Sequence, residues 1–286
     1  MKKIGFIGLG IMGNSMAGHL LAAGYELNVF NRSKSKTDQL VAKGAKWFDA
    51  IGDLTENSDV IITMVGYPAD VEDIYFGRDK ILDRAKNAFL IDMTTSSPSL
   101  AKRIADEAEK RGCHALDAPV SGGDIGARNA KLSIMVGATQ ADFDVVLPIL
   151  KVMGSNVVLQ GGPGSGQHTK MCNQIVIAGT IMGVSEGLGY AKSVGLDPFR
   201  VMESIGGGAA SGFQLINLGT KMIEGDFNPG FYAEHFLKDL KIALDEASKI
   251  KLDLPAVSLA RLLYEDLVAK GAGRSGTQVL YKKYLT

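Results

Sequence analysis

The stretch that decides the fold is Lys3-Ile4-Gly5-Phe6-Ile7-Gly8-Leu9-Gly10-Ile11-Met12-Gly13. Its first five residues predict a short buried strand, and the glycines that follow have the spacing GxGxxG. Apolar residues then recur at helical spacing from Met16 to Leu21, and Glu26–Phe30 predicts a second strand. A strand, this glycine pattern, a helix and another strand within about thirty residues form the context of a dinucleotide-binding fingerprint.

The three glycines have separate tasks in such a fingerprint. Gly8 permits the turn, Gly10 lets the backbone approach the pyrophosphate, and Gly13 lets the helix pack closely on the strand. The helix N-terminus adds positive potential. The alternative is a tight glycine turn without a ligand. We expect a dinucleotide to be bound by the whole loop, Gly8, Leu9, Gly10, Ile11, Met12 and Gly13.

The end of the second strand indicates which dinucleotide is preferred. An NAD site normally has Asp or Glu there, but this chain has Asn31-Arg32-Ser33 and no carboxylate before Asp38. Arg32 can form two hydrogen bonds to a 2′-phosphate and Ser33 can donate a third. We therefore expect NADP to be preferred, with NAD possible. The alternative is that Arg32 only stacks on the adenine and the protein accepts both.

The pattern of alternating strands and helices continues to about residue 160. Further strands are predicted at 59–65, 88–93, 113–117, 132–137 and 156–160, with helices at 70–74 and 99–111. Such alternation predicts an α/β fold, an open, doubly wound, mostly parallel sheet of the Rossmann type. Its ligand crevice lies beyond the carboxyl ends of the strands. Ser121, Gly122 and Gly123 follow one of these ends and suit a carboxylate, although as an isolated motif they could be a plain turn.

Beyond the glycine-rich segment 161–166 the alternation stops. We expect a dinucleotide-binding domain at 1–162, a long interdomain helix at 163–193 and an all-helical domain at 194–286. Glycines at 179, 183 and 187 predict a groove on the long helix, used in core or subunit packing. Asp239 lies at the edge of an apolar stripe in a later helix, and a solvated helix edge is its default interpretation.

Lys170 is the cation that stands out in the long helix, because the next one is Lys192. Asn173 and Gln174, three and four residues later, lie on the same helical face. An ammonium beside two carboxamides fits a site for an oxygen-rich small molecule. The alternative is a lysine at a helix start that extends into water.

The composition narrows the class of protein. The chain has 31 basic residues (Lys and Arg) and 31 acidic residues (Asp and Glu), so its formal net charge is zero. This balance gives no argument for nucleic acid or an anionic membrane surface as a partner. Cys113 and Cys172 are far apart and form no metal-ligand or disulfide pattern, and no acid pair at catalytic spacing occurs. We expect no bound metal, no signal peptide, no membrane span and a cytoplasmic location.

These motifs, in this order, resemble the β-hydroxyacid dehydrogenase family over essentially the full chain. The resemblance rests on Gly8–Ala17 as the cofactor signature, Asp117–Gly123 as the substrate signature, Gly164-Ser165-Gly166 with Lys170 as the catalytic motif, and Lys238-Asp239-Leu240. The family includes 3-hydroxyisobutyrate dehydrogenases, tartronate semialdehyde reductases and glyoxylate/succinic semialdehyde reductases. It implies hydride transfer between a nicotinamide and a small 3-hydroxyacid or a semialdehyde or 2-oxo acid, and dimers or tetramers formed through the helical domain.

The resemblance also implies roles for individual residues. Lys170 is then the catalytic acid and base, and Ser121, Gly122 and Gly123 hold the substrate carboxylate. Asn173, Gln174, Phe231 and Asp239 are the further substrate residues, and Val65, Thr95 and Lys238 the further cofactor residues. A glutamine at position 174 resembles the tartronate semialdehyde reductase branch of the family. Asn31-Arg32-Ser33 instead resembles the NADP-using glyoxylate/succinic semialdehyde reductases, so the identity of the substrate stays open.

An ammonium at position 170 can stabilise the oxygen that gains charge during hydride transfer and can give it a proton. In the oxidative direction a neutral lysine takes the proton, which requires burial to lower its pKa. His168 is a rival two residues away, but it points to another face of the helix and is interpreted as a surface residue. An imine reductase, or a sensor that binds the cofactor without chemistry, remain the alternative functions.

Overall fold

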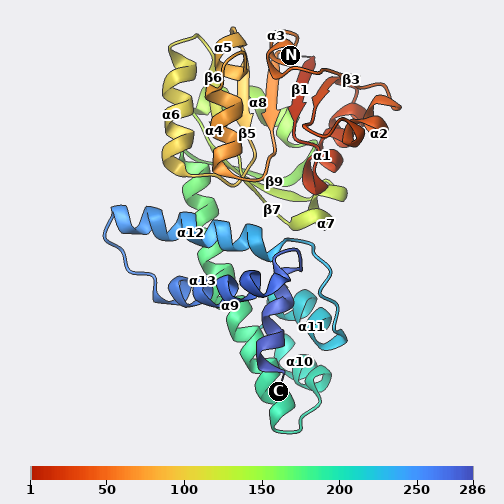
Figure 1. Cartoon of the computed structure of the whole chain (residues 1–286), viewed down its shortest axis with the longest axis vertical. Helices are drawn as coiled ribbons and strands as arrows, with labels where there is room; N and C mark the ends of the chain where they lie inside the picture. Colours follow the sequence, from red (N-terminus) through yellow and green to blue (C-terminus); the bar gives the residue numbers. More distant parts are fainter. Residues whose placement is uncertain (1, 286) are drawn as a thin grey trace. The chain divides into compact units, whose positions relative to one another are not determined.

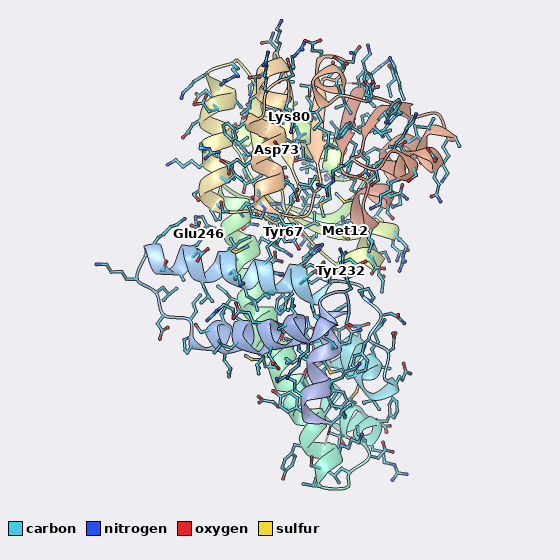
Figure 2. The ribbon with its side chains drawn as sticks, in the orientation of Figure 1. Met12, Tyr67, Asp73, Lys80, Tyr232 and Glu246 are labelled. Atoms are coloured by element: carbon cyan, nitrogen blue, oxygen red, sulfur yellow. The ribbon has the colours of Figure 1, made fainter. Side chains whose placement is uncertain are left out.

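The computed structural model describes residues 2–285, and the chain divides into two compact units, one up to Lys170 and one from Met171 (Figure 1). Polar side chains lie along the surfaces of both, as with the ion pair of Asp73 and Lys80 in the first unit (Figure 2). Among the described residues, no helix has the length and apolar character needed to cross a membrane.

The first unit contains a sheet and the helices that connect its strands. Its strands are β1 (Lys3–Ile7), β2 (Glu26–Phe30), β3 (Lys46–Trp47), β4 (Val60–Thr63), β5 (Phe89–Asp92), β6 (His114–Asp117), β7 (Val120–Ser121), β8 (Leu132–Gly137) and β9 (Gly154–Gly161). Its helices are α1 (Ile11–Ala22), η1 (Lys34–Thr37), α2 (Asp38–Val41), α3 (Ile51–Glu56), α4 (Pro68–Phe76), α5 (Ile81–Arg84), α6 (Pro98–Glu109), α7 (Gly123–Arg128) and α8 (Gln140–Leu150).

The strand order is β3-β2-β1-β4-β5-β6-β8-β7, with β9 paired to β8. The six strands from β3 to β6 in this order are parallel, whereas β8 runs antiparallel to β6 and β7, and β9 parallel to β8. The predicted open, mostly parallel sheet is therefore confirmed. The order reverses direction at β1, so the carboxyl ends of β1 and β4 flank the crevice where ligands bind in such sheets.

Side chains alternate between the two faces of the sheet and form a separate core on each. Phe6 and Ile62 pack into one cluster with α1 and α8, whereas Ile7 and Ile61 pack into the other with α3, α4 and α6. Figure 1 shows α4 and α6 on the latter face. Strands that are buried on both faces have continuous runs of apolar residues. Such runs made the positions of these strands predictable from the sequence.

The second unit is helical. Helix α9 (Ser165–Ser193) begins in the first unit and continues into the second, and the later helices are α10 (Pro198–Gly206), η2 (Gln214–Gly219), α11 (Thr220–Glu224), α12 (Ala233–Lys249), α13 (Pro255–Leu267), η3 (Val268–Ala272) and η4 (Thr277–Tyr284). Phe236 and Tyr264 meet edge to face, 5.0 Å between ring centroids, in the apolar core of this unit. The predicted long helix and helical C-terminal part are confirmed. The domain limits at 162 and 193 stay a prediction.

Candidate active site

The loop between β1 and α1 has the geometry that the glycine pattern predicts. Gly8 has φ +99°, and a Cβ there would lie 2.2 Å from the carbonyl oxygen of Met64. A Cβ on Gly13 would lie 2.0 Å from the carbonyl oxygen of Gly8, so this helix packs as closely on the loop as backbone allows. At Gly10 nothing lies within 4 Å of a Cβ position, which leaves room for a ligand such as a pyrophosphate.

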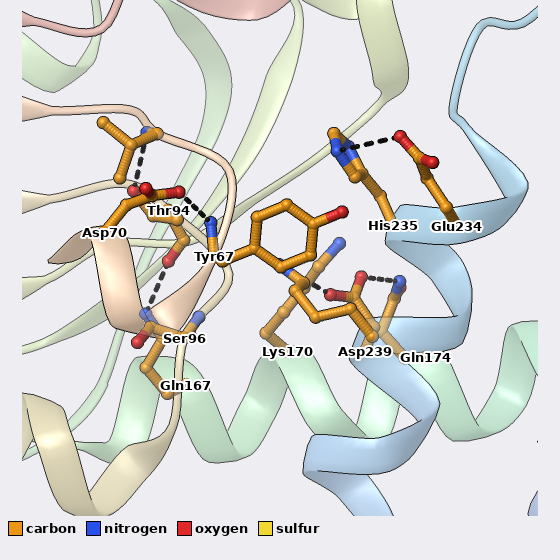
Figure 3. Close-up of polar contacts among 12 residues, drawn as sticks. Tyr67, Asp70, Thr94, Ser96, Gln167, Lys170, Gln174, Glu234, His235 and Asp239 are labelled. Carbon is orange, nitrogen blue, oxygen red and sulfur yellow. Dashed lines mark hydrogen bonds and ion pairs between the residues drawn. The ribbon is translucent and has the colours of Figure 1, made fainter. Parts of the chain in front are cut away.

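The end of β2 is tied to this loop. Asn31 accepts a hydrogen bond from the backbone N–H of Leu9 (2.9 Å) and donates one to the carbonyl of Ser33 (2.9 Å). The Arg32 side chain is 92% exposed and lies 3.9 Å from the carboxylate of Asp70. Asp70 also accepts a hydrogen bond from the N–H of Tyr67 (Figure 3). Asn31 therefore shapes the loop, while Arg32 stays accessible to a ligand.

The loops after β4 and β5 are joined by hydrogen bonds. The N–H of Val65 donates to the hydroxyl of Thr94 (3.0 Å), and the N–H of Thr94 donates to Asp92 (3.1 Å). Asp92 also accepts a hydrogen bond from Thr63 (2.8 Å). Burial raises the pKa of Asp92 to about 6, although these hydrogen bonds act in the opposite direction. Thr95, a predicted cofactor residue, lies half-buried in the second of these loops.

Lys170 is buried on the sheet side of the first turns of α9. Lys170 is only 6% exposed, and its Nζ donates a hydrogen bond to the carbonyl of Val120 at 2.8 Å. Val120 directly precedes Ser121, which is half-buried, and the next residues, Gly122 and Gly123, have positive φ angles of +127° and +61°. The structure thus brings the predicted acid and base next to the segment predicted to hold a carboxylate.

The second unit holds a chain of polar side chains on α9 and α12. Gln174 donates to Asp239 (2.6 Å), as Figure 3 shows. Asn173 donates to Gln174 (2.6 Å), and Lys238 Nζ lies 3.1 Å from the other oxygen of Asp239. That oxygen is buried and receives no well-angled hydrogen bond within residues 2–285. Asp239 is only 1% exposed, so the interpretation as a solvated helix edge is wrong. A buried carboxylate needs partners, and these residues supply them.

Phe231 and His235 lie near the start of α12. Their ring centroids are 6.5 Å apart, and both side chains are half-buried. Burial is the main cause that lowers the pKa of His235, and the charge of Lys238 lowers it further. A neutral imidazole is favoured there. His168, in contrast, is exposed, as its position on the helix predicted.

Asp117 and Gln167, neither of which has an individual role among the sequence predictions, lie at the start of α9 in the first unit. Asp117 accepts hydrogen bonds from the N–H groups of Gly164 (2.6 Å) and Gln167 (2.7 Å), which fixes the start of α9 to the end of β6. Burial raises the pKa of Asp117 to about 6 against the effect of these bonds. The signals were present, since Asp117 ends a predicted strand and Gln167 is a polar residue three positions before Lys170.

Two protein-family models match the chain. Residues 3–162 match the NAD-binding domain of 6-phosphogluconate dehydrogenase, and residues 164–284 match the NAD-binding domain of NADP-dependent 3-hydroxyisobutyrate dehydrogenase. Together they account for nearly all of the described residues.

Individual proteins agree with these models. The chain is 53% identical to an uncharacterised oxidoreductase of Bacillus subtilis, with 99% of each chain covered. It is 41% identical to the 2-hydroxy-3-oxopropionate reductase of Escherichia coli, over 95% of this chain and 93% of that protein. Among solved structures, 3-hydroxyisobutyrate dehydrogenase of Mycobacterium tuberculosis with L-serine has a TM-score of 0.91, 28% identity and 99% coverage of both chains. An imine reductase of Myxococcus stipitatus, at 17% identity and a TM-score of 0.66, shares the fold.

Proposed function

The chain belongs to the β-hydroxyacid dehydrogenase family and is an NAD(P)-dependent oxidoreductase of small hydroxyacids, and from this premise we propose that Lys170 is its general acid and base. The observation that carries the proposal is the buried ammonium 2.8 Å from the carbonyl of Val120, directly before Ser121. A buried cation beside a segment suited to carboxylates is a specific arrangement, because an unused ammonium would lower its energy by reaching water.

Bound NAD(P) supplies or accepts the hydride. In reduction, Lys170 faces a carbonyl oxygen that gains negative charge, and its ammonium stabilises that charge and gives the oxygen a proton. In oxidation, the neutral amine takes the proton from the hydroxyl. The carbonyl of Val120 holds Nζ in place for both directions, which limits the reorganisation that the reaction requires.

We propose that Ser121 and the N–H groups of Gly122 and Gly123 bind the substrate carboxylate. The left-handed backbone of the two glycines supports this, since a side chain there would be strained and would crowd the amides. Asn173, Phe231 and Asp239 stay proposed substrate residues. Gln174 also stays one, but both ends of its amide are already bonded, to Asn173 and Asp239, so its effect on substrate would pass through those residues.

For the cofactor, we propose that NADP is preferred to NAD. Arg32 and Ser33 are exposed at the end of β2, where a 2′-phosphate would lie beside the fingerprint loop. Gly8, Leu9, Gly10, Ile11, Met12 and Gly13 are the proposed pyrophosphate loop, with Asn31 supporting it. Val65, Thr95 and Lys238 are the further proposed cofactor contacts.

The test is a panel of 3-hydroxyacids and short semialdehydes, with NADPH and NADH, read by nicotinamide absorbance. Lys170→Ala is expected to lower turnover at least about a hundredfold and to leave cofactor binding nearly unchanged. Lys170→Arg keeps the charge but cannot act as a base, so it is expected to be nearly as inactive. Lys192→Ala, at an exposed lysine of the same helix, is the control.

Near-normal turnover of Lys170→Ala would contradict the proposal that Lys170 is the general acid and base. Clear cofactor binding without turnover of any carbonyl acid would instead favour a sensor, and turnover of imines alone would favour an imine reductase. Lys170 argues against an imine reductase, since the enzymes of that group generally lack a lysine at this position.

We further propose that the protein works in the cytoplasm as a homodimer or homotetramer formed through the helical unit. Both cysteines, Cys113 and Cys172, are free thiols, which suits a reducing compartment. Most of the exposed large apolar side chains lie in the second unit, although it is the shorter of the two. Such side chains suit a subunit interface.

A further inference from the structure

Gln167 is an unusual residue in the first turn of α9, because its amide is fully buried and bonded at both ends. Its carbonyl oxygen accepts the N–H of Ser96 (2.9 Å), and its NH₂ group donates to the carbonyl of Thr94 (2.7 Å), as Figure 3 shows. The two partners lie more than seventy residues upstream, in the loop after β5. The amide thus spans Thr95 and fixes the backbone on both sides of it.

The backbone of Gln167 is fixed as well. Its N–H donates to Asp117 (2.7 Å), whose other oxygen accepts the N–H of Gly164 (2.6 Å). Three residues after Asp117, the carbonyl of Val120 accepts the bond from Lys170. Gln167 therefore sits where the ends of β5 and β6 meet the helix that carries Lys170.

We propose that Gln167 is a positioning residue that holds Thr95 and Lys170 in a fixed relation to each other. The proposal rests on the proposed function, since it gives Gln167 a task only if Thr95 lies at the cofactor and Lys170 at the substrate. Hydride transfer requires both reactants within a narrow range of distance and angle, and a shift of about 1 Å can lower the rate about a hundredfold. A side chain that joins the two supports limits that shift.

The chemistry of the contact explains why the residue is a glutamine. The loop offers one N–H and one carbonyl, so the side chain must accept with one atom and donate with the other. An ionised glutamate can only accept and would face the carbonyl of Thr94 with a negative charge. A protonated glutamic acid can do both, and burial raises the pKa of such a carboxyl. Methionine has a similar length and does neither.

The test compares Gln167→Met and Gln167→Glu with the unaltered chain. Gln160→Met is the matched control, since Gln160 is an exposed glutamine of β9 whose amide donates to Val158 in its own strand and accepts from Thr169, away from the loop after β5. The first readout is kcat per folded enzyme, with KM measured separately. We expect at least a tenfold fall in kcat for Gln167→Met, a small change in KM and no change for the control.

The second readout is the pH dependence of Gln167→Glu. Its kcat relative to the unaltered chain is expected to rise by at least about threefold from pH 8 to pH 6, as the carboxyl gains the proton that restores the donor. A residue that serves only the stability of the fold would change the folded fraction and leave kcat per folded enzyme the same. Because glutamate has nearly the shape of glutamine, this variant keeps the test available if Gln167→Met does not fold.

The third readout is hydrogen exchange of the Ser96 N–H, which needs no substrate. Gln167→Met is expected to speed it at least about tenfold, and Gln160→Met to leave it unchanged. Unchanged exchange, or faster exchange with kcat unaltered, would each overturn the proposal. Inactivity of the unaltered chain with every substrate would count against the proposed function instead, since the exchange measurement is independent of it.

Discussion

Arg32 is the exposed side chain on which the proposed preference for NADP rests. Its guanidinium lies 3.9 Å from the carboxylate of Asp70 and is otherwise open to solvent. A 2′-phosphate could therefore form charge-assisted hydrogen bonds with Arg32 and would displace only this long ion pair. We expect Arg32→Ala to lower kcat/KM for NADPH at least about tenfold and to change that for NADH less than about threefold. Steady-state kinetics with both cofactors measure this.

The matched control is Arg78→Ala. Arg78 is 96% exposed and also lies 3.9 Å from a carboxylate, that of Asp79, so it has the same chemistry away from the end of β2. Equal losses with NADPH and NADH in Arg32→Ala would mean that Arg32 acts on the adenine side of both cofactors. The NADP preference would then be abandoned.

Asp239 and Gln167 mark the limit of prediction at the scale of residues. Helical periodicity placed Asp239 at the edge of a stripe, but its partner Gln174 is 65 residues away in the chain, and periodicity carries no information on such pairs. Gln167 was overlooked for the same reason. Lys170, in contrast, could be singled out from its lone charge in an apolar helix, and it is buried beside Val120.

At the scale of elements, the ends of β5 and β6 each carry a buried aspartate, Asp92 and Asp117. Both have a pKa raised to about 6 by burial, above the ordinary value of 3.8. The folded state therefore holds more protons than the unfolded state between about pH 4 and pH 6. The contribution of these two groups to the free energy of unfolding falls as the pH rises through that range and is constant above it.

Replacing Asp92 with asparagine tests this sign. Its amide oxygen can still accept from Thr63 and Thr94, but it does not ionise. Relative to the unaltered chain, the free energy of unfolding of Asp92→Asn is expected to increase by about 1 kcal/mol from pH 5 to pH 7.5. Urea denaturation at the two pH values measures it, with Asp106→Asn at an exposed site of α6 as control. A decrease in the relative free energy of unfolding over this range would mean that the pKa of Asp92 is lowered in the folded state and not raised.

The elements themselves were largely predictable where burial gives a simple pattern. The parallel strands other than β3, and α9, follow from apolar runs, whereas β3, β7 and α7 were not predicted. Gly122, with φ +127°, joins β7 and α7 in a turn that no periodicity reveals. Helix α8 was also missed, although Phe143, Val146 and Leu150 have helical spacing, because Pro148 interrupts the pattern.

At the scale of the whole molecule, the chain is two units with different surfaces. The first buries its apolar strands under helices on both faces, while the second leaves a row of small and apolar residues exposed on α9. Gly179, Gly183 and Gly187 have nothing within 4 Å of a Cβ position, and Val176 and Tyr190 are 64% and 70% exposed. Their spacing of three and four residues places them on one helical face.

A second copy of the chain is the proposed partner of that face, because the glycines allow close approach of another helix and the apolar side chains gain from burial. Val176→Glu would bury a charge in such an interface, and we expect it to shift the oligomer toward monomer by at least about tenfold in dissociation constant. Sedimentation velocity over a concentration series measures the shift. Val158→Glu, at a 43% exposed valine of β9 in the first unit, is the matched control. If both variants keep the mass of the unaltered protein, this face of α9 does not hold the subunits together.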